Sequence, residues 1–193
     1  MALIVPFEGP FSWPGLPGAP CIFEAAVGKG SGIYLWTVPQ DSYELIYYVG
    51  ETGRSFATRM QEHYKEHAAG FYHLNDADAL MQGRRVMVWP GLWDVGERPT
   101  RASCVEQFPK LAPLIATLSR IYRFYVAPIE CPTRLRRRIE AAIARVIAGN
   151  PPPVGTFQEE GIRYYVRKPD EAPVNCQFVN GDNLRGLPRK LVI

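Results

Sequence analysis

The sequence is poor in the features that mark secreted disulfide scaffolds, zinc modules and membrane proteins. Its 193 residues include only four cysteines, and no two of them are close enough to form a C-x-x-C pair. Their spacing argues against a zinc knuckle and against a disulfide framework. We therefore expect four small, buried, apolar side chains, at Cys21, Cys104, Cys131 and Cys176.

Long hydrophobic runs are also missing, and so is a strong charge of either sign. No apolar stretch approaches the roughly 20 residues that cross a bilayer, and the first residues do not resemble a signal peptide. The net charge of +3 allows nucleic-acid binding where basic residues cluster but does not demonstrate it. With 47% hydrophobic and 21% charged residues, the composition predicts one cytoplasmic, globular domain that does not bind a membrane.

What is abundant is proline and glycine in the first 31 residues. Such a segment cannot form a long helix or a central strand. It also contains Phe7, Phe11 and Trp13, which need an apolar surface to cover them. We predict that residues 1–31 form an extended arm packed on the rest of the domain.

A strand–strand–helix pattern follows the arm. Residues 32–38 (GIYLWTV) and 44–49 (ELIYYV) are rich in β-branched and aromatic residues and flank a turn-like segment, which predicts a β-hairpin. A helix is expected from the N-cap Ser55 to Gly70. Its apolar stripe of Phe56, Met60 and Tyr64 lies apart from the face that carries Arg59 and His63.

Residues 74–120 are interpreted as an insertion. Asn75 or Asp76 could begin a short helix, residues 85–89 favour a strand, and residues 110–119 favour a helix whose start Pro113 limits.

Beyond the insertion, residues 121–129 predict a strand, and a helix capped by Thr133 is expected to run to Ala148, where Gly149 and three prolines stop it. Residues 151–193 form a C-terminal extension with a strand expected at residues 162–167.

The order of these segments carries a resemblance. Gly32-Ile33-Tyr34, then Tyr48-Val49-Gly50, then a helix with Arg59 and His63, resembles the GIY-YIG endonuclease superfamily. The resemblance implies an α+β fold, with a small, mainly antiparallel sheet flanked by helices, and a nuclease core over residues 32–150. It also implies a metal-dependent endonuclease that hydrolyses DNA, either of the restriction type or a repair or mobile-element nicking enzyme.

The same resemblance implies a set of catalytic residues: Tyr34, Tyr48, Arg59, His63 and Glu140. Glu140 would be the protein ligand of Mg²⁺ or Mn²⁺, since Mg²⁺ binds through one or two carboxylates together with substrate phosphate oxygens. Arg59 offers a planar fork for phosphate oxygens. Tyr34 and His63 both remain candidates for the general base, because a free tyrosine has a pKa of about 10 and histidine is better matched to neutral pH.

DNA is the expected partner, with RNA left open, and phosphate contacts are expected from Arg54, Lys65, Arg136, Arg137 and Asn150. A homodimer is a further expectation, because a one-site enzyme cuts both strands only as two protomers or by two successive nicks.

Simpler interpretations remain open for each feature. The chain could be a catalytically silent nucleic-acid-binding module of the same fold. Glu140 could merely pair with Arg136 or Arg137 on its own helix. His67 and His73 are expected at the surface, and Trp36, Trp89 and Trp93 are expected to pack in the core or the insertion.

Overall fold

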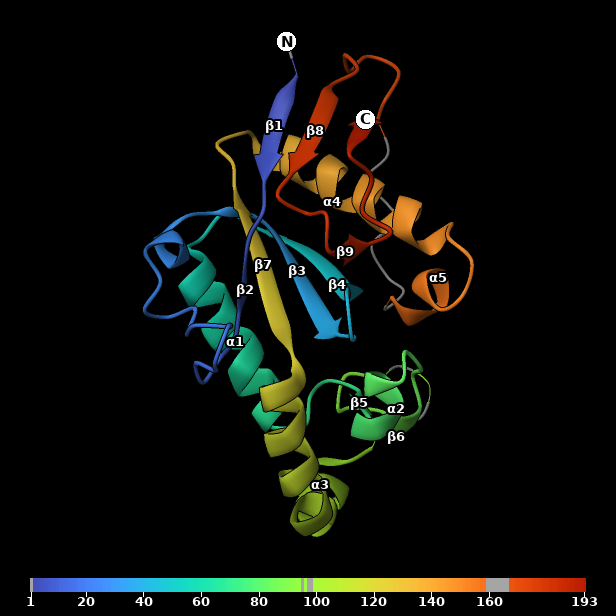
Figure 1. Ribbon diagram of the computed structural model, residues 1–193. Helices are drawn as coiled ribbons and strands as arrows, with labels where there is room; N and C mark the ends of the chain where they lie inside the picture. Colours follow the sequence, from blue (N-terminus) through green and yellow to red (C-terminus); the bar gives the residue numbers. More distant parts are fainter. Residues whose placement is uncertain (1, 95, 97–98, 159–166) are drawn as a thin grey trace.

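The protein is a mixed α/β molecule built around a curled, mainly antiparallel sheet (Figure 1). The computed structural model describes residues 2–94, 96, 99–158 and 167–193. The central sheet has five strands in the order β2-β7-β3-β4-β9, and only the short β4–β9 pair is parallel. The sheet is formed by β2 (Glu8–Phe11), β7 (Arg123–Pro128), β3 (Gly32–Pro39), β4 (Glu44–Thr52) and β9 (Leu184–Arg185). The predicted α+β class is confirmed at this level.

The hairpin of β3 and β4 lies at the centre of this sheet, as the sequence predicts. Its register pairs Tyr34 with Gly50 and Trp36 with Tyr48. Because side chains alternate along a strand, Tyr34 and Tyr48 are diagonal neighbours on one face of the sheet. The hairpin therefore presents both motif tyrosines to the same side.

Helix α1 (Phe56–Ala68) packs against that side and begins as predicted, with the Ser55 hydroxyl accepting a hydrogen bond from the Thr58 N–H. Phe56 and Met60 of the expected apolar stripe are completely buried. The third member, Tyr64, is 43% exposed, so the stripe prediction is wrong there. On the face that carries Arg59 and His63, the His63 side chain is buried against aromatic rings of β3 and β4.

The insertion starts with β5 (Leu74–Asn75), α2 (Ala77–Met81) and β6 (Met87–Trp89). Asp76 caps α2, which confirms one of the two predicted starts. The strand expected over residues 85–89 is shorter than predicted. Two of its three side chains are exposed to solvent, with Met87 55% and Val88 51% accessible.

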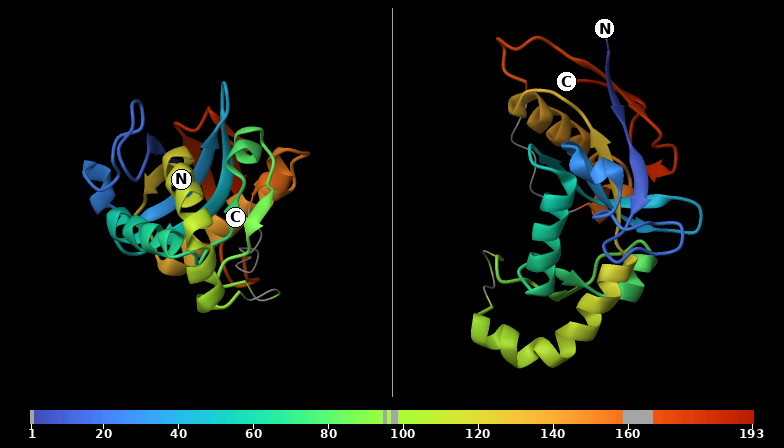
Figure 2. Two further views of the ribbon diagram at one scale, coloured as in Figure 1. Left: turned by 90° about the horizontal axis from the view of Figure 1, so that it is seen from below. Right: turned by 90° about the vertical axis from the view of Figure 1, so that its left-hand side faces the viewer.

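Helix α3 (Arg101–Ile121) corrects the sequence interpretation of a helix limited to residues 110–119. It begins about two and a half turns earlier, where the Thr100 hydroxyl accepts a hydrogen bond from the Ser103 N–H. Pro109 and Pro113 lie inside it. Each proline lacks an N–H donor and crowds the preceding turn, which bends a helix rather than ending it when both flanks remain helical. Figure 2 shows the resulting curvature along α3.

Helix α4 (Thr133–Ala148) packs mainly against β4 and carries Glu140. The predicted cap is wrong: the helix begins at Thr133, and Pro132 occupies the cap position without a side-chain hydrogen bond. Thr133 instead accepts a hydrogen bond from Arg136. The short η1 (Ala26–Lys29) and α5 (Val154–Phe157) complete the helices of the described residues.

The proline- and glycine-rich arm packs on the domain, as predicted, and supplies only edge strands. β1 (Leu3–Pro6) pairs in parallel with β8 (Asn175–Val179), which β10 (Lys190–Val192) borders on its other side. Phe7 and Trp13 are 1% and 3% exposed. The strand predicted at residues 162–167 falls almost entirely outside the described residues.

Buried side chains from both hairpin strands, the arm and the helices form one continuous core. Cys104 and Cys176 are buried as expected, whereas Cys21 and Cys131 are half-buried, and all four thiols are free. Within the described part of the chain, no helix has both the length and the apolar composition needed to cross a bilayer.

Candidate active site

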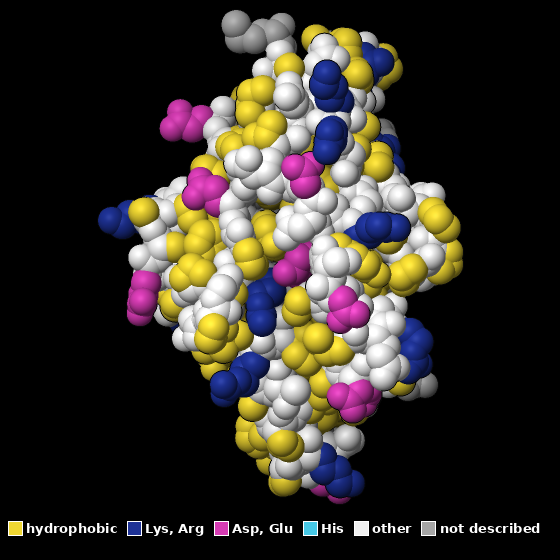
Figure 3. Space-filling view, in the orientation of Figure 1, with side chains coloured by type: hydrophobic (Ala, Val, Ile, Leu, Met, Phe, Trp, Pro, Cys, Tyr) yellow, Lys and Arg dark blue, Asp and Glu magenta, His cyan; other side chains and the backbone are white. Residues whose placement is uncertain are grey.

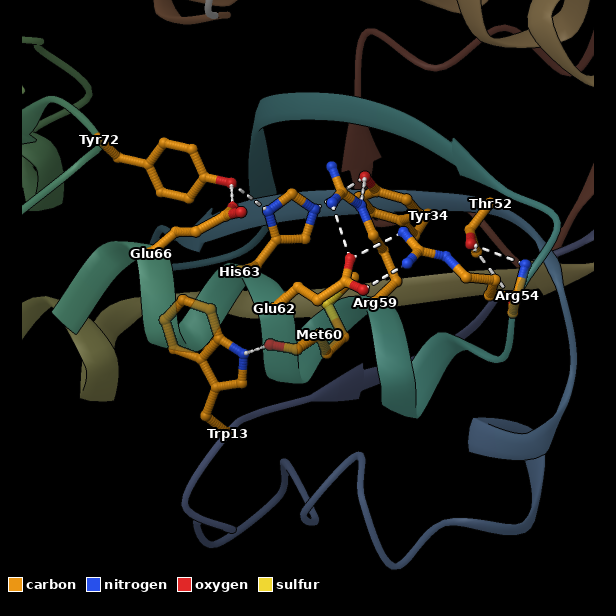
Figure 4. A network of polar contacts seen from close by, with 10 residues as sticks. All are labelled: Trp13, Tyr34, Thr52, Arg54, Arg59, Met60, Glu62, His63, Glu66 and Tyr72. Atoms are coloured by element: carbon orange, nitrogen blue, oxygen red, sulfur yellow. Dashed lines mark hydrogen bonds and ion pairs between the residues drawn. The ribbon is translucent and has the colours of Figure 1, made fainter. Parts of the chain in front are cut away.

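The Tyr34 hydroxyl is the centre of a hydrogen-bonded network between β3 and α1 (Figure 4). It lies 2.8 Å from Nε2 of His63 and 3.3 Å from Nε of Arg59, which donates to it. The Tyr48 hydroxyl is a further hydrogen-bond partner. Four of the residues expected from the sequence motif are therefore brought together around one oxygen atom.

Gly50 is required by this packing. A Cβ atom added at this position would lie 2.2 Å from Cζ and 2.4 Å from the hydroxyl oxygen of Tyr34. Because Gly50 is the direct cross-strand partner of Tyr34, any side chain there would push the ring out of place. The glycine of the second motif thus makes room for the tyrosine of the first.

His63 is held on both ring nitrogens. Its Nδ1 lies 2.8 Å from the hydroxyl of Tyr72, and this hydroxyl in turn donates a hydrogen bond to the Glu66 carboxylate. The His63 side chain is 3% exposed and lies among the rings of Tyr34, Trp36 and Tyr48.

Sequence reasoning missed both outer groups. Glu66 shares the helical face of His63, one turn later, and this spacing could have identified it. Tyr72 carries no such signal, because the chain must reverse after α1 before this side chain can reach His63.

Tyr48 lies beside Tyr34, with their ring centroids 6.2 Å apart. It is half-buried, whereas Tyr34 is 1% exposed. Of the two motif tyrosines, Tyr48 is therefore closer to the solvent, and Tyr34 is enclosed.

Arg59 connects the buried network to the surface. Its Nη1 atom donates to the Glu62 carboxylate at 3.1 Å, and Glu62 also receives a bidentate contact from Arg54. The Arg54 side chain is 59% exposed. An exposed, paired arginine next to an enclosed one is an arrangement in which incoming phosphate oxygens could replace the Glu62 carboxylate.

Glu140 approaches the same centre from α4. Its carboxylate acts electrostatically on Tyr34 and Arg59, and it accepts a hydrogen bond from the backbone N–H of Glu51. Burial raises the pKa of Glu140 to about 7, and the nearby Glu51 carboxylate adds to that rise. A carboxylate held in this way is stabilised by any cation that reaches it.

Two basic residues expected to contact DNA have structural partners instead. Nε of Arg136 and Nε of Arg137 donate to the Glu51 carboxylate at 3.1 and 3.3 Å. Arg136 is buried and also binds the Cys131 carbonyl, so it is not available to a phosphate in this conformation. Both arginines contact Glu51, and the positive charge of Arg137 also acts on the Glu140 carboxylate.

Asn150 likewise turns inward. Its amide donates to the carbonyls of Val146 and Ile147, which closes the end of α4. Lys65, by contrast, is exposed on α1. On the face shown in Figure 3, acidic and basic side chains are interspersed and form no basic band. Arg54, Lys65 and the 44% exposed side chain of Arg137 are therefore the accessible candidates of the five.

Burial shapes the acid–base properties of the network. It raises the pKa of Tyr34 to about 12, although the adjacent Arg59 guanidinium opposes this effect. It lowers the pKa of His63 to about 3, and the positive charges of Arg59 and Arg54 lower it further. Both side chains are therefore uncharged at neutral pH.

The two other histidines, His67 and His73, lie outside this network, and neither is fully exposed as the sequence predicted. His67 was expected at the surface but is 1% exposed, stacked on Trp13 and donating to the Ile115 carbonyl. His73 is half-buried and pairs with Asp94 at 3.3 Å. Trp36 and Trp89 are buried as expected, whereas Trp93 is 54% exposed.

The donor set at Glu140 fits a hard divalent cation but not a complete protein-built metal centre. Within the described residues, no group of three or more histidine, cysteine, aspartate or glutamate side chains could hold a metal ion. Mg²⁺ and Mn²⁺ sites in nucleic-acid enzymes need only one or two carboxylates, because phosphate and water supply the other oxygens. A buried carboxylate with a raised pKa is compatible with this type of site.

Comparisons with protein-family models, with curated proteins and with solved structures yield no match to this chain.

Proposed function

We propose that this protein is a metal-dependent endonuclease of the GIY-YIG type that hydrolyses DNA phosphodiester bonds. The observation that carries the proposal is the environment of one oxygen atom, the Tyr34 hydroxyl. His63 and Arg59 contact it from α1, and the Glu140 carboxylate acts on it from α4. A purely structural tyrosine would need one hydrogen-bond partner, not a base, a guanidinium and a carboxylate from separate elements.

The arrangement favours Tyr34 as the group that activates water. Nε2 of His63 faces the Tyr34 hydroxyl and Nδ1 faces Tyr72, so the imidazole is placed to take a proton from Tyr34 and not from water directly. Tyr34 would accept a proton from water while its own proton moves to Nε2 of His63. The hydroxide then forms the bond to phosphorus as the bond to the leaving oxygen breaks.

Arg59 and Glu140 would stabilise the phosphate in this step. The guanidinium of Arg59 can bind non-bridging oxygens in place of Glu62, where negative charge develops. Glu140 would hold Mg²⁺ or Mn²⁺, which polarises the phosphoryl group and stabilises the leaving oxygen when it is bound. Glu51 lies beside that site, but its carboxylate is occupied by Arg136 and Arg137.

Plasmid cleavage tests the proposal directly. Supercoiled plasmid is incubated with the protein and Mg²⁺, Mn²⁺ or a chelator, and single-stranded DNA and RNA serve as alternative substrates. We expect metal-dependent nicking that E140Q lowers by roughly 1,000-fold or more. E106Q is the matched control, because Glu106 is exposed on α3, and it should cleave at the wild-type rate.

A second pair of variants tests the tyrosine. Y34F removes only the central hydroxyl and should abolish nicking, whereas Y64F removes an exposed hydroxyl on α1 and should not. Cleavage that survives E140Q or Y34F would contradict the assigned roles. Wild-type protein that binds DNA in gel-shift assays but never cleaves it would favour the silent binding module.

A further inference from the structure

The second nitrogen of His63 has partners that take no part in the mechanism above. Nδ1 lies 2.8 Å from the Tyr72 hydroxyl, which donates to the Glu66 carboxylate. Tyr34, His63, Tyr72 and Glu66 thus form an unbroken chain of hydrogen bonds from the enclosed centre to a half-buried carboxylate. Figure 4 shows the two outer members, Tyr72 and Glu66, on the side of the His63 ring away from Tyr34.

The contact at the end of this chain fixes the direction of every hydrogen bond in it. An ionised carboxylate can only accept, so the Tyr72 proton points to Glu66. The Tyr72 oxygen then faces Nδ1 with a lone pair, and Nδ1 must carry the ring proton. A neutral imidazole has one N–H, so Nε2 is left as an acceptor facing the Tyr34 hydroxyl.

The opposite tautomer is disfavoured by the same geometry. If Nε2 carried the proton, Nδ1 would have to accept the Tyr72 proton. Tyr72 and Glu66 would then face each other with lone pairs at close distance, which is repulsive. Only the Nδ1–H form of His63 therefore lets every hydrogen bond in the chain pair a donor with an acceptor.

We propose that Tyr72 and Glu66 are positioning residues that hold His63 in the Nδ1–H form, and that Glu66 receives the proton displaced from Tyr34. This inference rests on the proposed nuclease function for its catalytic part. The Tyr34 proton binds Nε2, the Nδ1 proton moves to the Tyr72 oxygen, and the Tyr72 proton moves to Glu66. His63 and Tyr72 each gain one proton and lose one, so both end in their neutral forms while the Glu66 carboxylate becomes protonated.

A relay of this kind suits the environment of His63. Burial and the neighbouring Arg59 guanidinium make a charged imidazolium unfavourable, as the lowered pKa of His63 indicates. Passing the proton onward to a carboxylate avoids a lasting positive charge inside the protein. Glu66 is half-buried and can exchange its proton with solvent.

The backbone after α1 is shaped to hold Tyr72 in place. Gly70 has a φ of +70°, which ends the helix and reverses the chain. A Cβ atom at Gly91 would lie 2.7 Å from the carbonyl carbon of Tyr72, so the two segments pack at backbone contact. The Trp93 N–H donates to the Phe71 carbonyl, and its ring lies 5.4 Å from that of Tyr72.

Nitrogen-15 NMR of the histidine rings tests the tautomer without any assay of activity. The chain has only three histidines, and the variant H63Q identifies the His63 signals. We expect the Nδ1–H form in the wild type, its loss in Y72F, and its retention in E66Q, because a glutamine oxygen still accepts from Tyr72. Y64F is the matched control and should leave the spectrum of His63 unchanged. An Nε2–H form in the wild type, or an unaltered tautomer in Y72F, would overturn the proposal.

Single-turnover cleavage then tests the route of the proton. Both Y72F and E66Q should slow cleavage by roughly 100-fold, the lower end of what a positioned acid–base group contributes. E66Q separates the two roles, because it keeps the tautomer and removes the proton acceptor. Wild-type cleavage by E66Q would refute the role of Glu66 as acceptor. Failure of the nuclease function itself would appear as inactive wild-type protein, and the NMR experiment would still decide the tautomer.

Discussion

His63 and His67 lie one turn apart on α1 and have different surroundings. Both are buried, and burial lowers both pKa values, to about 3 and about 4. The ring of His63 has a hydroxyl on each nitrogen, and those hydroxyls belong to a chain that continues in both directions. The ring of His67 is stacked on Trp13, and its Nε2 has no hydrogen-bond partner among the described residues.

The comparison teaches that burial and a shifted pKa do not by themselves mark a functional histidine. Both groups share these properties, because any imidazole removed from water favours its neutral form. What distinguishes His63 is that its neighbours can exchange protons with it in sequence. His67 contacts aromatic rings and one carbonyl, which can hold it but cannot accept a proton from it.

The largest expected effect is the difference in cleavage rate between two matched variants, in which either His63 or His67 is replaced by glutamine. H63Q should lower the rate of DNA cleavage by about 100- to 10,000-fold, the range that a positioned acid–base group supplies. H67Q should leave the rate per folded molecule within a few-fold of the wild type. Single-turnover cleavage, with the folded fraction measured by circular dichroism, checks both. Equal losses in the two variants would remove the distinction between them.

The arm that covers His67 should matter for stability and not for chemistry. Trp13 is 3% exposed and donates to the Met60 carbonyl at 3.1 Å, so W13A should lower the free energy of unfolding by about 3–5 kcal/mol. W93A removes the same side chain from a position that is 54% exposed and should cost less than about 1 kcal/mol. Urea denaturation measures both. A larger loss in W93A would show that the arm contributes little.

The pH dependence of stability should reveal His67. Its pKa is lowered in the folded state, so its stabilising contribution is present above the unfolded value near 6.5 and is lost as the pH falls toward about 4. The difference between these two pKa values corresponds to about 3 kcal/mol. Urea denaturation at pH 7 and at pH 4.5 should therefore show a smaller drop in stability for H67Q than for the wild type. Parallel curves for the two proteins would contradict the prediction.

The smallest effect is expected at the solvent-exposed start of α1. Arg54 is 59% exposed and paired with Glu62, so R54A should change the free energy of unfolding by less than about 1 kcal/mol. If Arg54 contacts a phosphate, R54A should lower the salt dependence of DNA binding by about one unit of slope. K110A, which removes an exposed charge on α3, is the control. Identical salt slopes for R54A and the wild type would show that Arg54 does not contact a DNA phosphate.

Much of the site could be anticipated because its members follow local rules. Alternation along two strands brings Tyr34 and Tyr48 to one face, and the spacing of four residues puts Arg59 and His63 on one side of α1. The hairpin, α1 and α4 have strong periodic patterns, and all three occur where expected. The helix over residues 110–119 was underestimated because Pro109 and Pro113 normally signal an end, and tertiary packing of Leu111 and Leu118 overrides that signal.

By itself, the sequence determined which side chains could take part in chemistry and which local elements would carry them. Only the tertiary structure decided which of them meet. Tyr72 reaches His63 because the chain reverses at Gly70, and Arg136 turns to Glu51 because β4 passes beside α4. His67 is enclosed because the arm folds back over α1, a long-range contact that has no local signature. The physical reason is the same in each case: hydrogen bonds and burial depend on distances across the fold, whereas periodicity records only neighbours along the chain.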